Sequence, residues 1–177
     1  MTVRPILQFG HPALRVCSAA IAPGDPDLPS HIADLADTLA DFRRRTTWGR
    51  GIAANQVGIT KRLIVLNLGD GPQALVNPEI TWQSDETYEL WDDCFSLPDV
   101  LVRVRRPVSM SIRYVDAQFA PRTMERLDPA VTELLHHELD HIDGVLMVDR
   151  VIDPRLIIAR AMRDQAVTAL PAATART

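Results

Sequence analysis

The feature that most constrains this chain is the run His-Glu-Leu-Asp-His, which extends from His137 to His141. Residues four apart on an α-helix share one face, with Cβ atoms ~5–6 Å apart, so the two imidazoles can bind one divalent ion. Glu138 lies close enough to take a proton from a metal-bound water while staying outside the coordination shell. The same spacing occurs on surface helices with solvated imidazoles, but here an apolar stripe favours burial: Val131, Leu134, Leu135, Leu139 and Ile142.

A catalytic site of this type uses three protein ligands, so a third one must come from elsewhere in the chain. The metzincin pattern would place a histidine at position 147, which is Met147, and the thermolysin-like pattern needs a glutamate downstream of Glu138, where there is none. Both protease classes are therefore excluded. Upstream, Cys94 lies in the run Asp-Asp-Cys-Phe-Ser-Leu-Pro of residues 92–98, and its thiolate would complete a Cys-His-His site.

The other cysteine, Cys17, lies in a Val-Cys-Ser-Ala-Ala run and is interpreted as a small buried hydrophobic residue rather than a ligand. Two cysteines in 177 residues cannot form a disulfide framework. Because the N-terminal residues also lack a signal-like apolar block, we expect both thiols to be reduced.

A third segment, residues 49–58, has the sequence Gly-Arg-Gly-Ile-Ala-Ala-Asn-Gln-Val-Gly. Together with the cysteine run and the histidine run, it resembles the peptide deformylase family. That family carries, in this order, a glycine-rich segment ending in Gln, a Glu-Gly-Cys-Leu-Ser segment and a Gln-His-Glu-x-Asp-His helix. Residues 6–15, Ile-Leu-Gln-Phe-Gly-His-Pro-Ala-Leu-Arg, are similar to the family's opening, so the resemblance extends to about residue 160.

The resemblance implies that Cys94, His137 and His141 bind one divalent metal ion and that Glu138 is the general acid and base. Metal binding lowers the pKa of water from 15.7 toward ~7, which makes hydroxide available at neutral pH. Iron(II) is the ion that the family usually uses, and Zn²⁺, Ni²⁺ and Co²⁺ are alternatives, because thiolate and imidazole suit several ions. The implied fold is α+β, with antiparallel sheets around a central helix that carries the His-Glu-x-x-His motif.

In the family, the substrate is the N-formylmethionine end of a nascent polypeptide, and hydrolysis releases formate. By resemblance, the side-chain amide of Gln56 and the backbone N–H of Phe95 would donate hydrogen bonds to the formyl oxygen. Donors already aimed at a developing oxyanion avoid reorganisation during the reaction. The implied partners are therefore N-formylated nascent polypeptides, with the ribosome as a further candidate.

Four residues are the expected substrate contacts. The helix register places Glu133 and Leu134 on the same face as His137, so they are candidates for the wall of the pocket that takes the first side chain. Gly51 and Ile52 are the expected contacts from the glycine-rich segment. Since Glu133 makes the wall partly polar, we hypothesise that the site tolerates first residues other than methionine or acts on another formylated amine.

The sequence departs from the family pattern at several positions. Asp93 stands in place of Gly beside the cysteine, which adds a charge and disfavours a positive φ, unless its side chain simply points to solvent. Asn55 stands where many members have Pro. Leu101 falls roughly where some members use an Arg to hold the peptide, so the grip on the substrate beyond the first residue is expected to be either weakened or supplied otherwise, with Arg103 and Arg105 as candidates.

Two neighbours of the histidines have expected roles outside the first coordination shell. His136 should point away from the metal as a surface or outer residue, because adjacent helix positions face different directions. Asp140 is expected to bind nearby backbone or an arginine such as Arg106, with a solvated helix face as the alternative.

Three hypotheses for function follow. The first is a metal-dependent deformylase of N-formyl peptides, and the second is a diverged amide hydrolase of a small formylated metabolite. The third is a non-catalytic relative whose altered cysteine motif has lost the metal. Formate release from N-formyl peptides would support the first hypothesis, and release from small formamides alone would support the second. Elemental analysis for bound metal tests the third.

Composition limits the remaining possibilities. With 46% hydrophobic and 24% charged residues, the chain fits one domain over residues 1–170, with 171–177 as a flexible tail. A net charge of −4 argues against direct nucleic-acid readout, although the cluster Arg43 to Arg45 leaves contact with ribosomal RNA open. No apolar run approaches the ~20 residues needed to cross a bilayer, so we expect a cytoplasmic protein.

Local patterns predict the main elements. Ser30 is the expected N-cap of a helix to Arg45, and Asp128 with Pro129 opens the histidine helix, which Gly144 ends. A final helix is expected from Asp153 or Pro154 into the Ala-rich end. β-Branched content and alternation predict strands at residues 62–67, 73–77, 79–83, 103–105 and 108–115.

Overall fold

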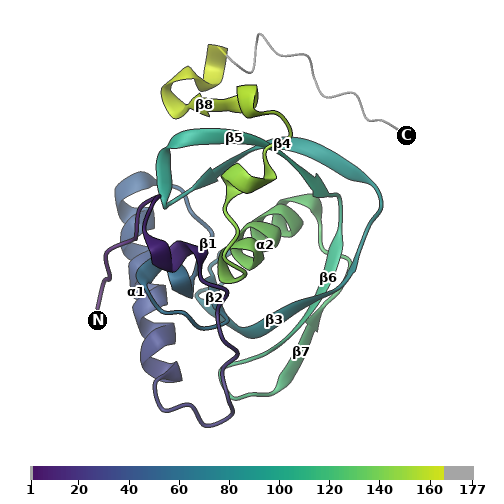
Figure 1. Cartoon of the computed structure of the whole chain (residues 1–177). Coiled ribbons are helices and arrows are strands. Elements are labelled where there is room, and N and C mark those ends of the chain that lie inside the picture. The colour runs from purple at the N-terminus through teal and green to yellow at the C-terminus, as the bar shows by residue number, and fades with distance from the viewer. Residues whose placement is uncertain (1, 166–177) are drawn as a thin grey trace.

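Helix α2 (Pro129–Ile142) lies at the centre of the computed structural model, with strands on several sides of it (Figure 1). The structure describes residues 2–165. A five-stranded antiparallel sheet has the order β1 (Gly51–Ala53), β2 (Leu63–Leu66), β3 (Gln73–Gln83), β6 (Met110–Val115), β7 (Pro121–Met124). A three-stranded antiparallel sheet has the order β4 (Thr87–Cys94), β5 (Leu97–Pro107), β8 (Ile157–Ala159). This arrangement confirms the expected α+β fold.

The boundaries of α2 are those that the sequence predicted. Asp128 Oδ1 accepts hydrogen bonds from the N–H groups of Ala130 and Val131, at 2.8 and 3.0 Å, and thus satisfies two donors that the helix leaves free. The helix ends at Ile142, and Gly144 follows with φ +75°. The apolar stripe is confirmed, with Val131 only partly buried and four members buried in the core: Leu134, Leu135, Leu139 and Ile142.

Helix α1 (Leu28–Thr46) begins three residues earlier than predicted. Asp27 is the N-cap residue, and the Ser30 hydroxyl donates to the Asp27 carbonyl at 2.8 Å instead of capping the helix. The predicted apolar face is present, with Leu35, Leu39 and Phe42 buried. Among residues 2–165, no helix combines the length and the apolar character needed to cross a membrane.

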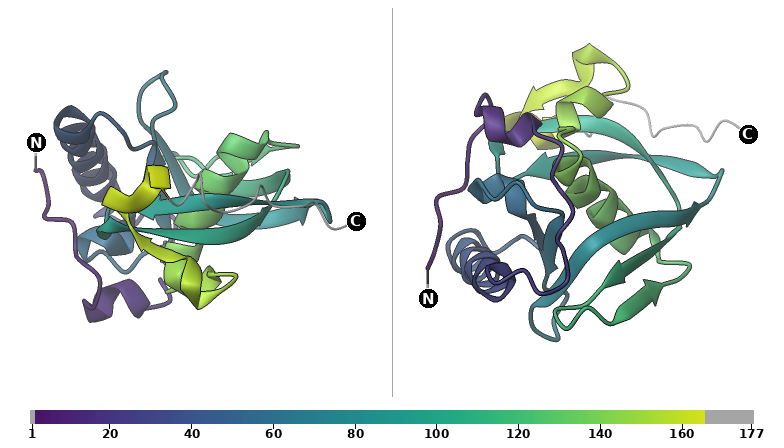
Figure 2. Two further views of the ribbon diagram at one scale, coloured as in Figure 1. Left: turned by 90° about the horizontal axis from the view of Figure 1, so that it is seen from above. Right: turned by 60° about the horizontal axis from the view of Figure 1, so that its bottom comes forward.

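Strand β2 separates the two helices, as both views in Figure 2 show. Its side chains point alternately to opposite faces, and each face is covered. Leu63 and Val65 belong to the apolar cluster around α1, whereas Ile64 and Leu66 belong to the cluster around α2. The complete burial of β2 therefore follows from its position between two cores.

The remaining strands differ from prediction mainly in length. The predicted strands 73–77 and 79–83 form one strand, β3, because Asn77 adopts φ +50° and the pairing with β6 shifts there without ending. The predicted strand 103–105 is the middle of β5, which forms a long hairpin with β4. Strands β1, β4 and β7 were not predicted, since their polar or short sequences show no clear alternation.

The predicted final helix is wrong over residues 153–162. Short 3-10 helices at Pro154–Leu156 and Arg160–Met162 flank β8, which pairs with the edge of β5. Pairing of β8 satisfies backbone groups along that edge, which the weak local signal of this segment could not reveal. The predicted tail, residues 171–177, lies outside the described residues.

Gly144 is a position at which we expect substitution to destabilise the fold. A Cβ atom there would lie 2.6 Å from the backbone oxygen of Arg15, and the residue has φ +75°. Gly24 has φ +79°, and a Cβ atom there would have no neighbour within 4 Å, so Gly24→Ala is the matched control. We expect about 1–2 kcal/mol of destabilisation for the control and about 1–3 kcal/mol more for Gly144→Ala, measured by urea unfolding. Equal losses in the two variants would contradict the close approach.

Candidate metal centre

Three potential metal ligands converge beside α2. The ligand atoms of Cys94, His137 and His141 lie within 4.8 Å of one another, and all three residues are buried. Cys94 is the last residue of β4, before the turn into β5, while the two histidines are one helical turn apart on α2. Cys94 Sγ lies 3.1 Å from His141 Nε2. A thiolate and two imidazoles at this separation suit a divalent transition metal.

A chain of buried charges fixes the orientation of His137. Its Nδ1 lies 2.9 Å from Asp92 Oδ1, which leaves Nε2 available to a metal. Arg106 donates to Asp92 at 3.0 Å and to Asp140 at 2.6 Å, and Arg150 donates to Asp140 at 2.7 Å. The expected contact between Asp140 and Arg106 is therefore present.

The pKa values in this chain reflect competition between burial and pairing. Burial raises the pKa of Asp92, but His137 and Arg106 outweigh it and lower that pKa to about 2. Burial lowers the pKa of His137, yet Asp92 and Cys94 raise it well above its usual value. A metal must displace the proton of His137 in order to bind, so metal affinity is expected to fall in acid.

Glu138 is a buried carboxylate beside this group, with 4% of its surface exposed. Burial raises its pKa, and although His137 opposes this effect, the pKa is about 7. Within residues 2–165, Glu138 Oε2 has no hydrogen-bond partner. A Cβ atom on Gly51 would lie 3.0 Å from Glu138 Oε1, so a glycine at that position leaves space for the carboxylate.

Gln56 is held with its amide nitrogen toward the cysteine. Its Oε1 accepts a hydrogen bond from the N–H of Ala53 at 2.9 Å, and its Nε2 donates to Cys94 Sγ at 3.7 Å and to Ser96 Oγ at 3.4 Å. Asn55, which stands where many family members have Pro, donates to the carbonyl of His141. The side chains of these two neighbours thus connect the glycine-rich segment to β4 and to α2.

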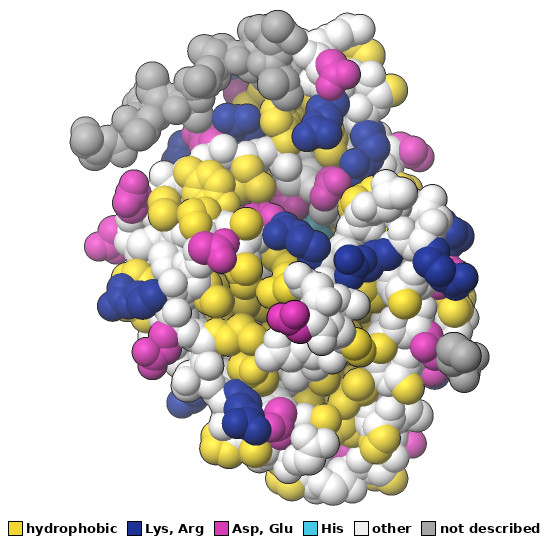
Figure 3. Space-filling view, turned by 180° about the vertical axis from the view of Figure 1, so that it is seen from behind, with side chains coloured by type: hydrophobic (Ala, Val, Ile, Leu, Met, Phe, Trp, Pro, Cys, Tyr) yellow, Lys and Arg dark blue, Asp and Glu magenta, His cyan; other side chains and the backbone are white. Residues whose placement is uncertain are grey.

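A cavity of about 200 Å³ is lined by two of the three potential ligands, Cys94 and His137. On the face drawn in Figure 3, acidic and basic side chains gather around a hollow in which a small area of histidine surface is visible. Of the predicted substrate contacts, Gly51, Glu133 and Leu134 line the cavity. Ile52 does not, because its side chain is fully buried in the apolar cluster around α1.

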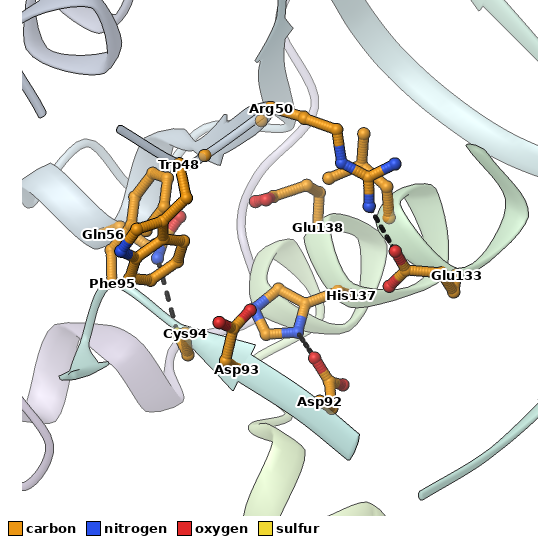
Figure 4. A pocket seen from close by; sticks show the side chains of 13 residues that line it. Trp48, Arg50, Gln56, Asp92, Asp93, Cys94, Phe95, Glu133, His137 and Glu138 are labelled. Carbon is orange, nitrogen blue, oxygen red and sulfur yellow. Dashed lines mark hydrogen bonds and ion pairs between the residues drawn. The ribbon is translucent and has the colours of Figure 1, made fainter. Parts of the chain in front are cut away.

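Two walls of the cavity contain residues that the sequence analysis did not assign to the site. On one side, Trp48 lies with its ring centroid 5.3 Å from that of Phe95. On the other side, Arg50 forms an ion pair with Glu133 (Figure 4). Arg50 also donates to the carbonyl of Ala130 at 3.0 Å. Burial raises the pKa of Glu133 although Arg50 opposes it. Arg50 precedes Gly51, a predicted substrate contact, and this adjacency could have indicated from the sequence that Arg50 lies at the cavity.

Asp93, the main departure from the family pattern, is accommodated by an arginine from the C-terminal segment. Arg160 Nη1 donates to Asp93 Oδ2 at 2.9 Å, and the guanidinium carbon lies 4.8 Å from the centroid of a Trp48 ring. Asp93 is not among the residues with positive φ, so the expected backbone strain does not arise. Its side chain, 40% exposed, is paired as well as solvated.

Other expectations near the site need correction. Arg103 and Arg105 do not line the cavity; both form ion pairs with Glu89 along the β4–β5 hairpin, while Leu101 is buried. Cys17 is exposed rather than buried. His136 is outside the ligand group, as predicted, and burial lowers its pKa to about 4.

A buried cysteine and two histidines beside a carboxyl group of raised pKa make up the site of a metal-dependent hydrolase. The family model for polypeptide deformylase matches residues 3–156. The peptide deformylase of Phenylobacterium zucineum is 33% identical over 172 residues, which cover 94% of each chain. That of Caldanaerobacter subterraneus is 36% identical over 152 residues, covering 86% of this chain and 91% of the relative.

Solved structures give the same result. The crystal structure of the Thermotoga maritima peptide deformylase matches with a TM-score of 0.79 and 31% identity, covering 86% of this chain and 100% of that one. The enzyme from Synechococcus elongatus, solved in complex with actinonin, matches with a TM-score of 0.76 and 30% identity, covering 97% of this chain and 87% of that one. The chain belongs to the polypeptide deformylase family.

Arg106 is expected to be the most sensitive member of the buried charge chain. Arg106→Met would leave the almost completely buried carboxylate of Asp92 without its arginine, and we expect a loss of about 3–5 kcal/mol. Arg113→Met removes a partner of exposed Glu79 and should cost less than about 1 kcal/mol. Thermal and urea unfolding of both variants checks this, and similar losses in the two would show that burial of the pair is unimportant.

The raised pKa of Glu138 predicts a pH-dependent stability of the metal-free protein. The pKa is about 7 in the folded state against a usual 4.5, so the folded state binds more protons between these values. Stability should therefore fall as pH rises from 4.5 to 7, by up to about 1.4 kcal/mol per pH unit. In urea unfolding with chelator present, the free energy of unfolding of Glu138→Gln should decrease less between pH 4.5 and 7 than that of the wild type. An equal decrease in the two proteins would contradict the prediction.

Proposed function

We propose that this protein removes the N-formyl group from N-formylmethionyl peptides by hydrolysis and releases formate. One observation carries the proposal: in a member of the polypeptide deformylase family, Cys94, His137 and His141 converge within 4.8 Å, with Glu138 buried beside them. Each of the four residue types has a defined use in metal-assisted amide hydrolysis.

Cys94, His137 and His141 would hold the metal ion, which supplies Lewis-acid activation of water and of the formyl carbonyl when it is bound. Asp92 orients His137 through Nδ1. Glu138 takes a proton from the attacking water and returns it to the departing amine. Its pKa of about 7 suits both transfers, because a group that titrates near the working pH exchanges protons most effectively.

Gln56 and Phe95 are the proposed donors to the formyl oxygen. The contact from Ala53 N–H to Gln56 Oε1 fixes the amide so that Nε2 faces the cysteine, which supports this role. The backbone N–H of Phe95 follows Cys94 directly, and its ring is stacked on Phe42 with centroids 3.9 Å apart, which limits movement of the turn. Donors held in this way need no reorganisation as negative charge develops.

Iron(II) is the ion that we propose, with Zn²⁺, Ni²⁺ and Co²⁺ as alternatives that the same ligand set accepts. The proposed substrates are N-formylated nascent polypeptides as they leave the ribosome, which would place the activity in the cytoplasm. A net charge of −4 is consistent with action on peptides without direct nucleic-acid readout. Glu133 and Leu134 are proposed to contact the first side chain, with Gly51 beside Glu138.

The altered cysteine motif does not favour a non-catalytic relative. Arg160 pairs with the added charge of Asp93, and the three potential ligands still converge. We therefore retain the deformylase as the single proposed function.

Glu138→Gln separates catalysis from metal binding. Protein purified without oxygen should contain about one metal ion per chain, and the variant should retain it, while formate release from a formyl-Met peptide falls by about 10²–10⁴-fold. Cys94→Ala should lose the metal, and Glu79→Gln, at an exposed ion pair, should change neither quantity. Metal-loaded wild-type protein that releases no formate from formyl-Met peptides would refute the proposed function.

A further inference from the structure

One wall of the cavity is an ion pair. Arg50, immediately before β1, and Glu133, on α2, meet beside the site, with the aromatic wall of Trp48 and Phe95 on the opposite side (Figure 4). Arg50 is anchored further by its hydrogen bond to the carbonyl of Ala130, at 3.0 Å. The pair therefore joins two elements that are distant in the sequence, and both side chains line the cavity.

The pair lies where the first side chain of a substrate would be placed, an argument that rests on the proposed function. Glu133 is four residues before His137 on α2, and positions with this spacing are neighbours on one helix face. A formamide held at the metal centre and Glu138 has its amine substituent only a few bonds from the reacting carbon. We take the wall formed by Arg50, Glu133 and Leu134 as the surface that this substituent meets, because all three line the cavity and Glu133 shares a helix face with His137.

The ion pair does not use all of its hydrogen-bonding capacity. In the described part of the chain, Glu133 Oε1 and two nitrogens of Arg50 are bonded, whereas Glu133 Oε2 and Arg50 Nε have no partner. Their side chains are 19% and 42% exposed, so water can serve these groups in the free protein. An apolar substrate side chain would displace that water without replacing its hydrogen bonds, which costs binding energy.

Glu133 Oε2 can accept a hydrogen bond and Arg50 Nε can donate one, which matches a primary amide, whose NH₂ donates and whose carbonyl accepts. We propose that the Arg50–Glu133 pair is a specificity determinant that lets the enzyme accept N-formyl peptides whose first residue is glutamine, in addition to methionine. Glutamine suits this role because its side chain is similar in length to methionine and differs mainly in polarity.

The test compares three peptides that differ only in the formylated residue: methionine, norleucine and glutamine. Norleucine reproduces the length of methionine without sulfur, so it reports on apolar contact alone. In wild-type protein we expect kcat/KM for the glutamine peptide to lie within about tenfold of that for the methionine peptide, because the amide finds partners in the wall. A deficit of more than about 100-fold, typical of an unpaired buried amide, would overturn the inference.

The double variant Arg50→Leu/Glu133→Leu makes the wall apolar. We expect the ratio of kcat/KM for glutamine over methionine to fall by about 10–100-fold, since the amide then loses its partners. The matched control, Arg113→Leu/Glu79→Leu, removes an exposed ion pair that does not line the cavity and should leave the ratio unchanged. A folded double variant with the wild-type ratio would also overturn the inference.

The outcomes separate this inference from the proposed function. Cleavage of the methionine and norleucine peptides, but not of the glutamine peptide, refutes only the role of the ion pair. Formate release from none of the three refutes the deformylase itself. Circular dichroism tests whether the double variant is folded. If it is unfolded, the ratio of kcat/KM for the glutamine and methionine peptides in the wild-type protein decides the inference.

Discussion

The structure depends on the contact between Asp92 and His137. A carboxylate and an imidazole that are almost completely buried must satisfy each other, and Arg106 extends this requirement to Asp140. Two of these residues lie on α2 and two on the β4–β5 hairpin, so the charges fix how the hairpin crosses the helix. Since Cys94 ends β4 two residues after Asp92, that crossing also decides where the thiolate meets the two imidazoles.

Burial has a second effect at the same place. Helix α2 is enclosed by the two sheets, and β2 separates its core from that of α1. Enclosure removes water from Glu138, which raises the pKa of its carboxyl into the range in which a carboxyl group can both accept and donate protons. The packing that buries α2 therefore also raises the pKa of Glu138. Gly51, which has no side chain, leaves space for the Glu138 carboxyl group.

Features specified by neighbouring residues could be predicted from the sequence. The cap at Asp128, the stripe of α2 and the end at Gly144 each depend on a few adjacent positions, and all three are present. The partner of Asp140 was also predicted. The contacts of Arg160 could not be, because that residue lies 67 positions from Asp93 and reaches it only through the pairing of β8 with β5. Ile52 was misplaced because alternation along β1 directs its side chain into the core.

The ion pair between Arg160 and Asp93 links the rim of the cavity to the last part of the described chain. The rim of the cavity is therefore completed by a residue that follows the last potential ligand, His141, in the sequence. Loss of the arginine would leave the carboxylate of Asp93, next to Cys94, without its ion-pair partner. The two positions therefore depend on each other through the pairing of β8 with β5.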